Sequence, residues 1–345
     1  MYDSLISFIY SLVAPCLSPC SPRSNVSSAR PVGVPMVKYS GNMHGDESVG
    51  REMIIALATH LLANYGVQDR VTQLLDNTEI HLVPSMNPDG FEAVTRGNYN
   101  QVDLNRGFPG AELLGATRAE LLEDREPEVA AMMQWTLDNP FVVSINFHDG
   151  AVVANYPWDQ RDQRPWERSE RFRGPAAVLE GLPYTGDHED FLMLAKLYAD
   201  RHATMAAGDS GCGKFAGGIT NGAEWYEISG GMQDFNYLYT NCMDITLELS
   251  CVKKPLARML QAEWEANLEP MLAYLEVAKS VLHGVVRDTS GQPVEAAHLQ
   301  VVFSEDPYNS ISDVGRNKDI LTTEAGEYWR VLAPGSYRVK AVKGS

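Results

Sequence analysis

The chain has 345 residues, of which 44% are hydrophobic and 21% charged, a balance typical of a folded globular protein and not of a disordered one. Its length allows one large domain or two smaller ones. The formal net charge of −17 argues against a nucleic-acid partner, because binding to phosphates needs a basic face.

The first 33 residues are rich in Ser and Pro and show no clear periodicity, so we expect a leader or a loop there. Residues 5–14 form a short apolar run that fits the core of a signal peptide, although Asp3 and the lack of a basic start do not. The run is too short to span a bilayer, and no other stretch is long and apolar enough. Asn25 opens an N-glycosylation sequon, which matters only in the secretory pathway.

From residue 36 onward, strand-like and helix-like segments alternate. In chain order we expect a strand at 36–39, a helix at 47–65, a strand at 79–84, a turn at 86–90 with a loop to 109, a helix at 125–137, a strand at 141–147, a helix at 188–207, a strand at 243–249 and a helix at 255–279. Such alternation predicts an α/β sheet with helices on both faces.

The composition changes after residue 280, where short β-like runs are separated by turns. The runs fall at 282–287, 298–303, 319–322, 328–332 and 337–342. This pattern predicts a small all-β sandwich or barrel.

The five cysteines do not match the spacing of a zinc finger or of a thioredoxin-type motif. Cys16 and Cys20 lie near the N-terminus, and Cys212, Cys242 and Cys251 lie together further on. The second group is an odd set, so at least one of its members is free or pairs elsewhere.

A metal site is indicated by His44 and Glu47, three residues apart where the first strand opens into a loop. Both side chains are ordinary zinc ligands and can reach one ion together. His148 ends the predicted strand at 141–147, where ligands of open α/β sheets gather. Two His and one Glu with an open position form a catalytic zinc pattern, although each residue alone also fits a surface loop or a core position.

Glu248 lies within the apolar strand at 243–249, where an unpaired carboxylate is costly. It is either half of a buried salt bridge or a general base acting on a zinc-activated water. Arg106 suits two-point binding of a carboxylate, and Arg96 suits stabilisation of an oxyanion. Tyr226 precedes a Gly-Gly pair and fits a loop that closes over substrate. Each of these three also fits a surface position.

Together these segments resemble the zinc metallocarboxypeptidases, or funnelins, and above all their regulatory N/E subfamily. The resemblance runs from about residue 31 to the C-terminus. The motifs that carry it are Gly-Asn-Met-His-Gly-Asp-Glu at 41–47, Met-Asn-Pro-Asp-Gly-Phe at 86–91, Asp-Leu-Asn-Arg-Gly-Phe-Pro at 103–109, Asn-Phe-His-Asp-Gly-Ala-Val-Val-Ala-Asn-Tyr-Pro-Trp-Asp at 146–159, Gly-Ile-Thr-Asn-Gly-Ala-Glu-Trp-Tyr at 218–226, Gly-Gly-Met-Gln-Asp-Phe-Asn-Tyr at 230–237 and Ile-Thr-Leu-Glu-Leu-Ser-Cys at 245–251.

The resemblance implies a catalytic domain at 31–279 with a mixed central sheet flanked by helices, lacking the strand and helix that come first in family members. Residues 1–30 would be a leader or an atypical N-terminal segment. Residues 280–345 would form a transthyretin-like β domain that stops short of the family's usual end.

The resemblance also implies catalytic roles. His44, Glu47 and His148 would bind one zinc ion. Glu248 would act as general base and then as proton donor, and Arg96 would stabilise the oxyanion. Asp149 stands where the family often has Gly, and its charge could perturb the metal.

Substrate contacts follow from the same resemblance. Asn105, Arg106 and Tyr226 would hold the terminal carboxylate. Asp159 and Gln233 would face the terminal side chain, which implies a preference for C-terminal Arg or Lys; Asp159 also fits an ordinary turn.

We therefore expect a monomeric zinc exopeptidase of the secretory pathway or extracellular space that acts on peptides and proteins. One alternative is a pseudo-peptidase that binds peptide C-termini without cleaving them. Another is an amidohydrolase that uses the same site on a small acylated amino acid.

Overall fold

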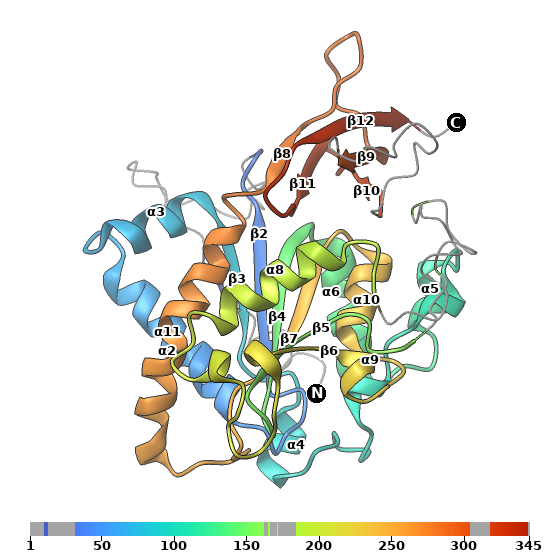
Figure 1. Ribbon diagram of the computed structural model, residues 1–345. Helices are drawn as coiled ribbons and strands as arrows, with labels where there is room; N and C mark the ends of the chain where they lie inside the picture. The colour runs from blue at the N-terminus through green and yellow to red at the C-terminus, as the bar shows by residue number, and fades with distance from the viewer. Residues whose placement is uncertain are drawn as a thin grey trace, which may run out of the picture.

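A seven-stranded sheet forms the centre of the molecule, in the strand order β1-β3-β2-β4-β7-β5-β6 (Figure 1). The computed structural model describes residues 10–12, 32–161, 165, 171, 184–303 and 318–343. The strands of this sheet are β1 Tyr10–Leu12, β2 Met36–Gly41, β3 Glu79–Val83, β4 Phe141–His148, β5 Val153–Tyr156, β6 Ile219–Asn221 and β7 Met243–Glu248. Strands β3, β2, β4 and β7 are parallel, whereas β1 and β5 run antiparallel to β3 and β7. The predicted mixed sheet is confirmed.

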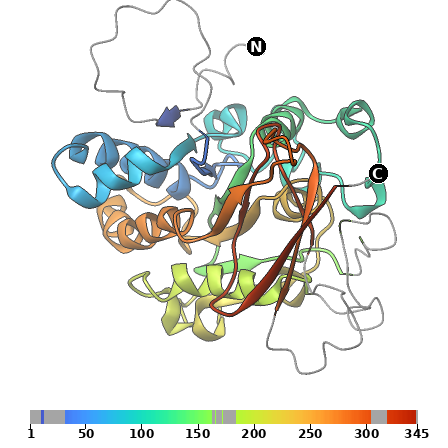
Figure 2. The same cartoon turned by 90° about the horizontal axis from the view of Figure 1, so that it is seen from above.

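Helices cover both faces of the sheet (Figures 1 and 2). They are α2 Val49–Asn64, α3 Asp69–Asn77, α4 Pro88–Ala93, α5 Arg118–Leu122, α6 Pro127–Asp138, α8 His188–Ala199, α9 Gly222–Trp225, α10 Met232–Tyr239 and α11 Leu260–Val277. The larger apolar cluster joins the sheet to α2, α3, α8 and α11, and a second cluster joins it to α5, α6 and α10. In α2, Met53, Leu57 and Leu61 repeat at helical spacing and are buried, which fixes this helix on the sheet.

Three predicted boundaries are wrong for local reasons. The turn at 86–90 holds only for its first residues, because Asn87 accepts the N–H of Gly90 and caps α4, which starts at Pro88. The helix expected at 188–207 ends at Ala199. The helix expected at 255–279 is shorter, since α11 begins at Leu260, after a 3₁₀ turn.

The predicted β runs after residue 280 form two small antiparallel sheets, β10-β9-β12 and β11-β8. Their strands are β8 Leu282–Val285, β9 Ala297–Phe303, β10 Ile320–Leu321, β11 Glu327–Arg330 and β12 Tyr337–Lys343. These β strands lie at the opposite end of the central sheet from α4 (Figure 1). Trp329 and Val331 pack into the larger apolar cluster, so the two parts share buried surface. The domain boundary near residue 280 stays a prediction.

Cys212 and Cys251 form a disulfide, and Cys242 is a buried free thiol. This agrees with the odd set expected from the sequence. Cys16, Cys20 and the Asn25 sequon lie outside the described residues. Within the described ranges, no helix has both the length and the apolar character needed to cross a membrane.

Candidate active site

The loop that joins β2 to α2 carries His44 and Glu47 and is held together by Asn42. The Asn42 backbone has φ 56°, a left-handed conformation that Asn tolerates better than most residues. Its side-chain Nδ2 donates to the carbonyl oxygens of His44, Gly45 and Glu47, at 3.0, 3.2 and 2.9 Å. A Cβ at Gly45 would lie 2.0 Å from the carbonyl carbon of Gly90, so only glycine fits there. The loop is therefore rigidly fixed around its two candidate ligands.

The two candidate ligands of this loop meet His148, the last residue of β4. Because β2 and β4 are parallel neighbours, their C-terminal ends lie side by side. Glu47 Oε2 lies 3.0 Å from His44 Nδ1 and 3.0 Å from His148 Nδ1, and the two Nδ1 atoms are 3.1 Å apart. A tetrahedral zinc site with bonds of about 2.0–2.1 Å separates its ligand atoms by about 3.3 Å. A small outward movement of these side chains would therefore let all three bind one ion. His44, Glu47 and His148 form one buried group suited to a single metal ion, here called the metal group.

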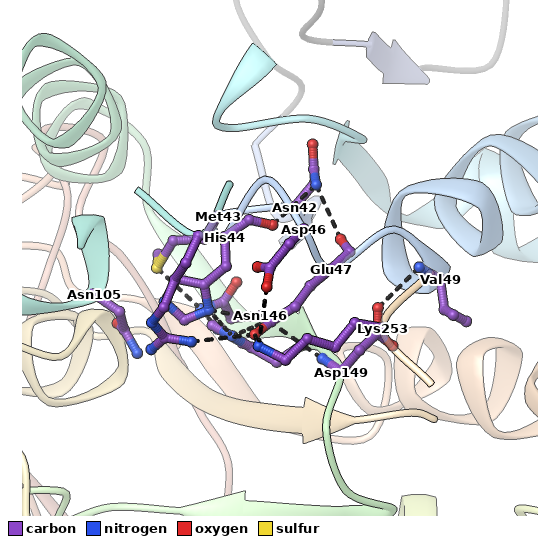
Figure 3. Close-up of polar contacts among 12 residues, drawn as sticks. Asn42, Met43, His44, Asp46, Glu47, Val49, Asn105, Asn146, Asp149 and Lys253 are labelled. Carbon is purple, nitrogen blue, oxygen red and sulfur yellow. Dashed lines mark hydrogen bonds and ion pairs between the residues drawn. The ribbon is translucent and has the colours of Figure 1, made fainter. Parts of the chain in front are cut away.

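The other ring nitrogen of each histidine faces a polar side chain, and Figure 3 shows one of these side chains, Asn146, beside the metal group. His44 Nε2 lies 3.0 Å from Asp103 Oδ1. His148 Nε2 lies 2.7 Å from Nδ2 of the Asn146 side-chain amide, which orients the His148 ring. The Asp103 carboxylate accepts the proton that His44 carries on Nε2, which leaves His44 Nδ1 free for a metal. Neither Asp103 nor Asn146 was predicted as a site residue, although both lie inside the motifs at 103–109 and 146–159.

The second oxygen of Glu47 faces positive charges. Lys253 Nζ lies 3.0 Å from Glu47 Oε1 and 3.3 Å from Asp46 Oδ2, and Arg96 Nη1 lies 3.3 Å from Glu47 Oε1. Burial alone would raise the pKa of Glu47, but the hydrogen bonds and charges of His148 and His44 outweigh it and hold that pKa far below its ordinary range. Glu47 is therefore kept ionised, as a metal ligand must be. Lys253 had no sequence signal, because it reaches this site from the loop after β7.

Asp149, the residue expected to perturb the metal, accepts a hydrogen bond at the N-terminus of α2. Its Oδ2 accepts the N–H of Val49 at 2.9 Å, a favourable position for a carboxylate. Burial raises the pKa of Asp149 well above its ordinary value, and the negative charges of Glu47 and Glu248 act in the same direction. The neutral form is thereby favoured, which reduces the charge next to the metal group.

Glu248 ends β7 and lies beside His148 in the parallel register. Its side chain is buried, and its Oε2 accepts no hydrogen bond from the part of the chain that the structure describes. Burial, followed by the charge of Glu47, raises the pKa of Glu248 to about 8. In the described residues Glu248 has no salt bridge within 4.0 Å, so the buried ion pair considered from the sequence is not formed there. A buried carboxylate with a free oxygen beside the metal group suits a general base.

A pocket opens at the metal group and brings most of the predicted site residues together. Its lining residues are His44, Arg96, Asn105, His148, Asn155, Asp159, Gly222, Trp225, Tyr226, Ile228, Thr246 and Glu248. The other three predicted residues, Glu47, Arg106 and Gln233, do not line it. Glu47 and Gln233 contact lining residues directly, and Arg106 Nη1 is 3.9 Å from Asp103 Oδ2.

The more buried of the two acidic residues that line this pocket is Asp159, whose exposed fraction is 4%, against 8% for Glu248. Its Oδ1 accepts Gln233 Nε2 at 2.7 Å and Asn155 Nδ2 at 3.3 Å, and a Cβ at Gly222 would lie 2.1 Å from the same oxygen. Burial, followed by the charge of Asp234, raises the pKa of Asp159 well above its ordinary value. In the described residues no Lys or Arg pairs with Asp159 within 4.0 Å. The pocket is thus lined by a buried carboxyl group that a cationic ligand would ionise.

The polar residues at the mouth of the pocket are anchored to different degrees. Arg96 is 40% exposed in its side chain and its Nε lies 2.9 Å from Asp103 Oδ2. Asn105 is buried, and its Oδ1 accepts the N–H of Met232 at 3.0 Å. Tyr226 is 50% exposed, with its ring against that of Trp225. Arg96 and Asn105 are held in place by these contacts, whereas no hydrogen bond from the described residues holds the Tyr226 hydroxyl.

Comparison with known proteins agrees with this geometry. A family model described as "Zinc carboxypeptidase" matches residues 23–270. The chain belongs to the zinc carboxypeptidase family. Family membership and the His-Glu-His group together identify one zinc ion as the cofactor.

Three relatives illustrate the similarity to other members of the zinc carboxypeptidase family. Carboxypeptidase D of Drosophila melanogaster is 40% identical over 330 residues, which cover 92% of this chain and 22% of the fly protein. The carboxypeptidase N catalytic chain of Mus musculus is 41% identical over 334 residues, 89% of this chain and 68% of that protein. Carboxypeptidase M of Mus musculus is 40% identical over 321 residues, 89% of this chain and 66% of that protein. The predicted likeness to the N/E subfamily, carboxypeptidase D included, is confirmed, and the chain spans only part of each relative's length.

Solved structures support the same fold. Thrombin activatable fibrinolysis inhibitor gives a TM-score of 0.54 at 17% identity, covering 78% of this chain and 64% of that chain. The bovine form in complex with a tick carboxypeptidase inhibitor gives a TM-score of 0.51 at 17% identity, covering 70% and 81%. At this identity the comparison concerns the fold alone.

Proposed function

We propose that this protein is a zinc-dependent exopeptidase that removes a C-terminal Arg or Lys from peptides and proteins. The observation that carries the proposal is the buried Asp159, which lines the same pocket as His44 and His148, accepts a hydrogen bond from Gln233 and pairs with no Lys or Arg of the described residues. A basic side chain entering this pocket would meet a buried carboxyl group, and its positive charge would stabilise the ionised form of that group. A net charge of −17 also favours basic ligands over acidic ones.

The catalytic residues would act as follows. Zinc bound to the His-Glu-His group supplies a Lewis acid that polarises the scissile carbonyl and lowers the pKa of a water molecule. Glu248 takes a proton from the attacking water and later delivers it to the leaving amine, which its raised pKa favours. Arg96, held by Asp103, places its guanidinium where negative charge develops on the carbonyl oxygen.

Cleavage would be confined to the last residue by a clamp on the terminal carboxylate. Asn105 and Arg106 come from one 3₁₀ turn, Leu104–Arg106, and Tyr226 lines the same pocket as Asn105. Arg can bind a carboxylate at two points. An internal peptide bond presents no such carboxylate and would bind weakly.

The alternative of a non-catalytic protein that captures peptide C-termini predicts binding without turnover. The presence of Glu248 beside a complete His-Glu-His group favours catalysis. The test compares wild type with Glu248→Gln, both shown to contain zinc, on a peptide ending in Arg. We expect wild type to release Arg and Glu248→Gln to bind the peptide with a turnover reduced by about 10²–10⁴-fold. Equal behaviour of the two proteins, without release, would favour the pseudo-peptidase.

The proposed location is the secretory pathway or the extracellular space. The Cys212–Cys251 disulfide fits an oxidising compartment, and the Asn25 sequon fits a glycoprotein. We further propose a monomer with a catalytic domain at 31–279 and a β domain at 280–345. Expression in secreting cells tests the location: the medium should contain protein whose mass falls on removal of N-linked glycans.

A further inference from the structure

Helix α10 connects the pocket that Asp159 lines to the β strands after residue 280. At its first turn, Gln233 donates to Asp159 Oδ1 at 2.7 Å. The neighbouring Asp234 accepts the backbone N–H groups of Asp159 and Gln160, at 2.9 and 3.1 Å. All residues from Met232 to Leu238 are buried, so the helix cannot move without disturbing what surrounds it.

The other half of α10 is held by residues of the β part. The Tyr237 hydroxyl donates to Asp187 Oδ2 at 2.7 Å, and Arg330 of β11 donates to the other oxygen of Asp187. Lys318, just before β10, donates to the carbonyl oxygens of Tyr237 and Thr240, at the C-terminal end of the helix.

Tyr237 also contacts the chain that carries Asp159. Its ring packs edge-on against Trp158, with ring centroids 5.1 Å apart, and Trp158 directly precedes Asp159. A continuous set of contacts therefore runs from Arg330 through Asp187 and Tyr237 to Trp158. Both Arg330 and Asp187 are buried, so the ion pair between them is shielded from solvent.

We propose that Arg330 is a positioning residue for substrate specificity. Through Asp187 and Tyr237 it holds α10 and Trp158 in place. Asp159 and Gln233 are thereby kept where they can contact the terminal side chain of the substrate. The β strands are then part of the specificity apparatus as well as a packing partner. This inference rests on the proposed preference for basic C-terminal residues. It predicts that loss of the contact affects recognition of Arg more than the chemistry at the metal.

The test uses the zinc-loaded full chain with Arg330→Met, Arg330→Lys and Tyr237→Phe. Tyr237→Phe removes a single hydroxyl and covers the case in which Arg330→Met fails to fold. Val301→Ala is the matched control, because Val301 packs within the β strands' own apolar cluster. Two quantities are measured: kcat and KM for a peptide ending in Arg, and hydrogen exchange at the backbone amides of Asp159 and Gln160.

We expect Arg330→Met and Tyr237→Phe to raise KM for the Arg peptide about tenfold, equivalent to about 1.4 kcal/mol, with kcat changed less than about threefold. The two amides should exchange about tenfold faster, and Arg330→Lys should recover most of both effects. Val301→Ala should lower Tm and leave both quantities unchanged.

Unchanged KM and unchanged exchange in Arg330→Met and Tyr237→Phe would overturn the proposal, as would an equal shift in Val301→Ala. If the wild-type protein releases no Arg, the proposed function fails. The exchange measurement still decides the role of Arg330 in that case, because it needs no substrate.

Discussion

Replacement of Asp159 by Asn isolates the charge at the end of the pocket. The amide keeps the size of the side chain and can still accept the hydrogen bond from Gln233. The backbone N–H of residue 159 still donates to Asp234, so the local chain should not move. The substitution therefore removes the negative charge and leaves the shape of the pocket.

The magnitude follows from the burial of Asp159. Removing one partner of a buried charge pair costs about 2–5 kcal/mol. Since burial raises the pKa of Asp159, part of the pair's energy is used to ionise the free carboxyl group, and the lower end of that range applies. We expect kcat/KM for a peptide ending in Arg to fall about 30–200-fold, at about 1.4 kcal/mol per factor of ten.

The assay measures kcat/KM of wild type and Asp159→Asn on two peptides that differ only in a C-terminal Arg or Leu. The Leu peptide should change less than about threefold, because an apolar side chain gains nothing from the charge. In wild type, KM for the Arg peptide should rise as the pH falls through the raised pKa of Asp159, since protonation removes the charge. An unchanged Arg-to-Leu ratio in Asp159→Asn would refute the role given to this residue.

Three further predictions concern metal affinity, pH and the disulfide. Asp103→Asn should weaken zinc binding about 10–100-fold, because Asp103 orients His44. Competition with a chelating dye measures the zinc affinity, and Asp138→Asn on the surface is the control. Equal zinc affinities of the two variants would contradict the role given to Asp103. Burial, followed by the charge of Asp187, raises the pKa of Asp190 to about 6. The neutral carboxyl group therefore contributes its full share of the folding free energy below about pH 4, and this contribution is lost as the pH rises through about 6. Asp190→Asn should therefore raise Tm at about pH 8 and leave it unchanged at about pH 4; the opposite pattern would show that the ionised carboxylate is the stabilising form. Replacing both Cys212 and Cys251 by Ser should lower the free energy of unfolding by about 4 kcal/mol in the chain-entropy model, because the two residues are 39 positions apart in the sequence. Denaturant titration measures this free energy, and a loss below about 1 kcal/mol would argue against the disulfide.

The metal group was predictable because the rules that place it are local and topological. His44 and His148 follow apolar strands, and the C-terminal ends of parallel strands meet at one edge of a sheet. Glu248 followed from the same rule and from the cost of a carboxylate in an apolar strand. The two small sheets after residue 280 were visible from alternating runs and turns.

Other elements gave no readable pattern. Helix α10 is buried from Met232 to Leu238, and its polar residues Gln233, Asp234 and Asn236 are buried with the apolar ones, so no exposed polar face marks it as a surface helix. Strands β5 and β6 are short and contain Asn or Thr, and only pairing with their neighbours defines them. Lys253 and Arg330 act across about 200 and 140 residues of chain on Glu47 and Asp187, and such contacts exist only after folding.

The central claim is that this chain uses one zinc ion to remove a single basic residue from a peptide C-terminus. Mass spectrometry of one peptide ending in Arg, as free acid and as amide, tests it directly with zinc-loaded protein. We expect loss of one Arg from the acid, no change in the amide, and no loss from the acid after chelation. No cleavage of the acid, or equal cleavage of the amide, would contradict it.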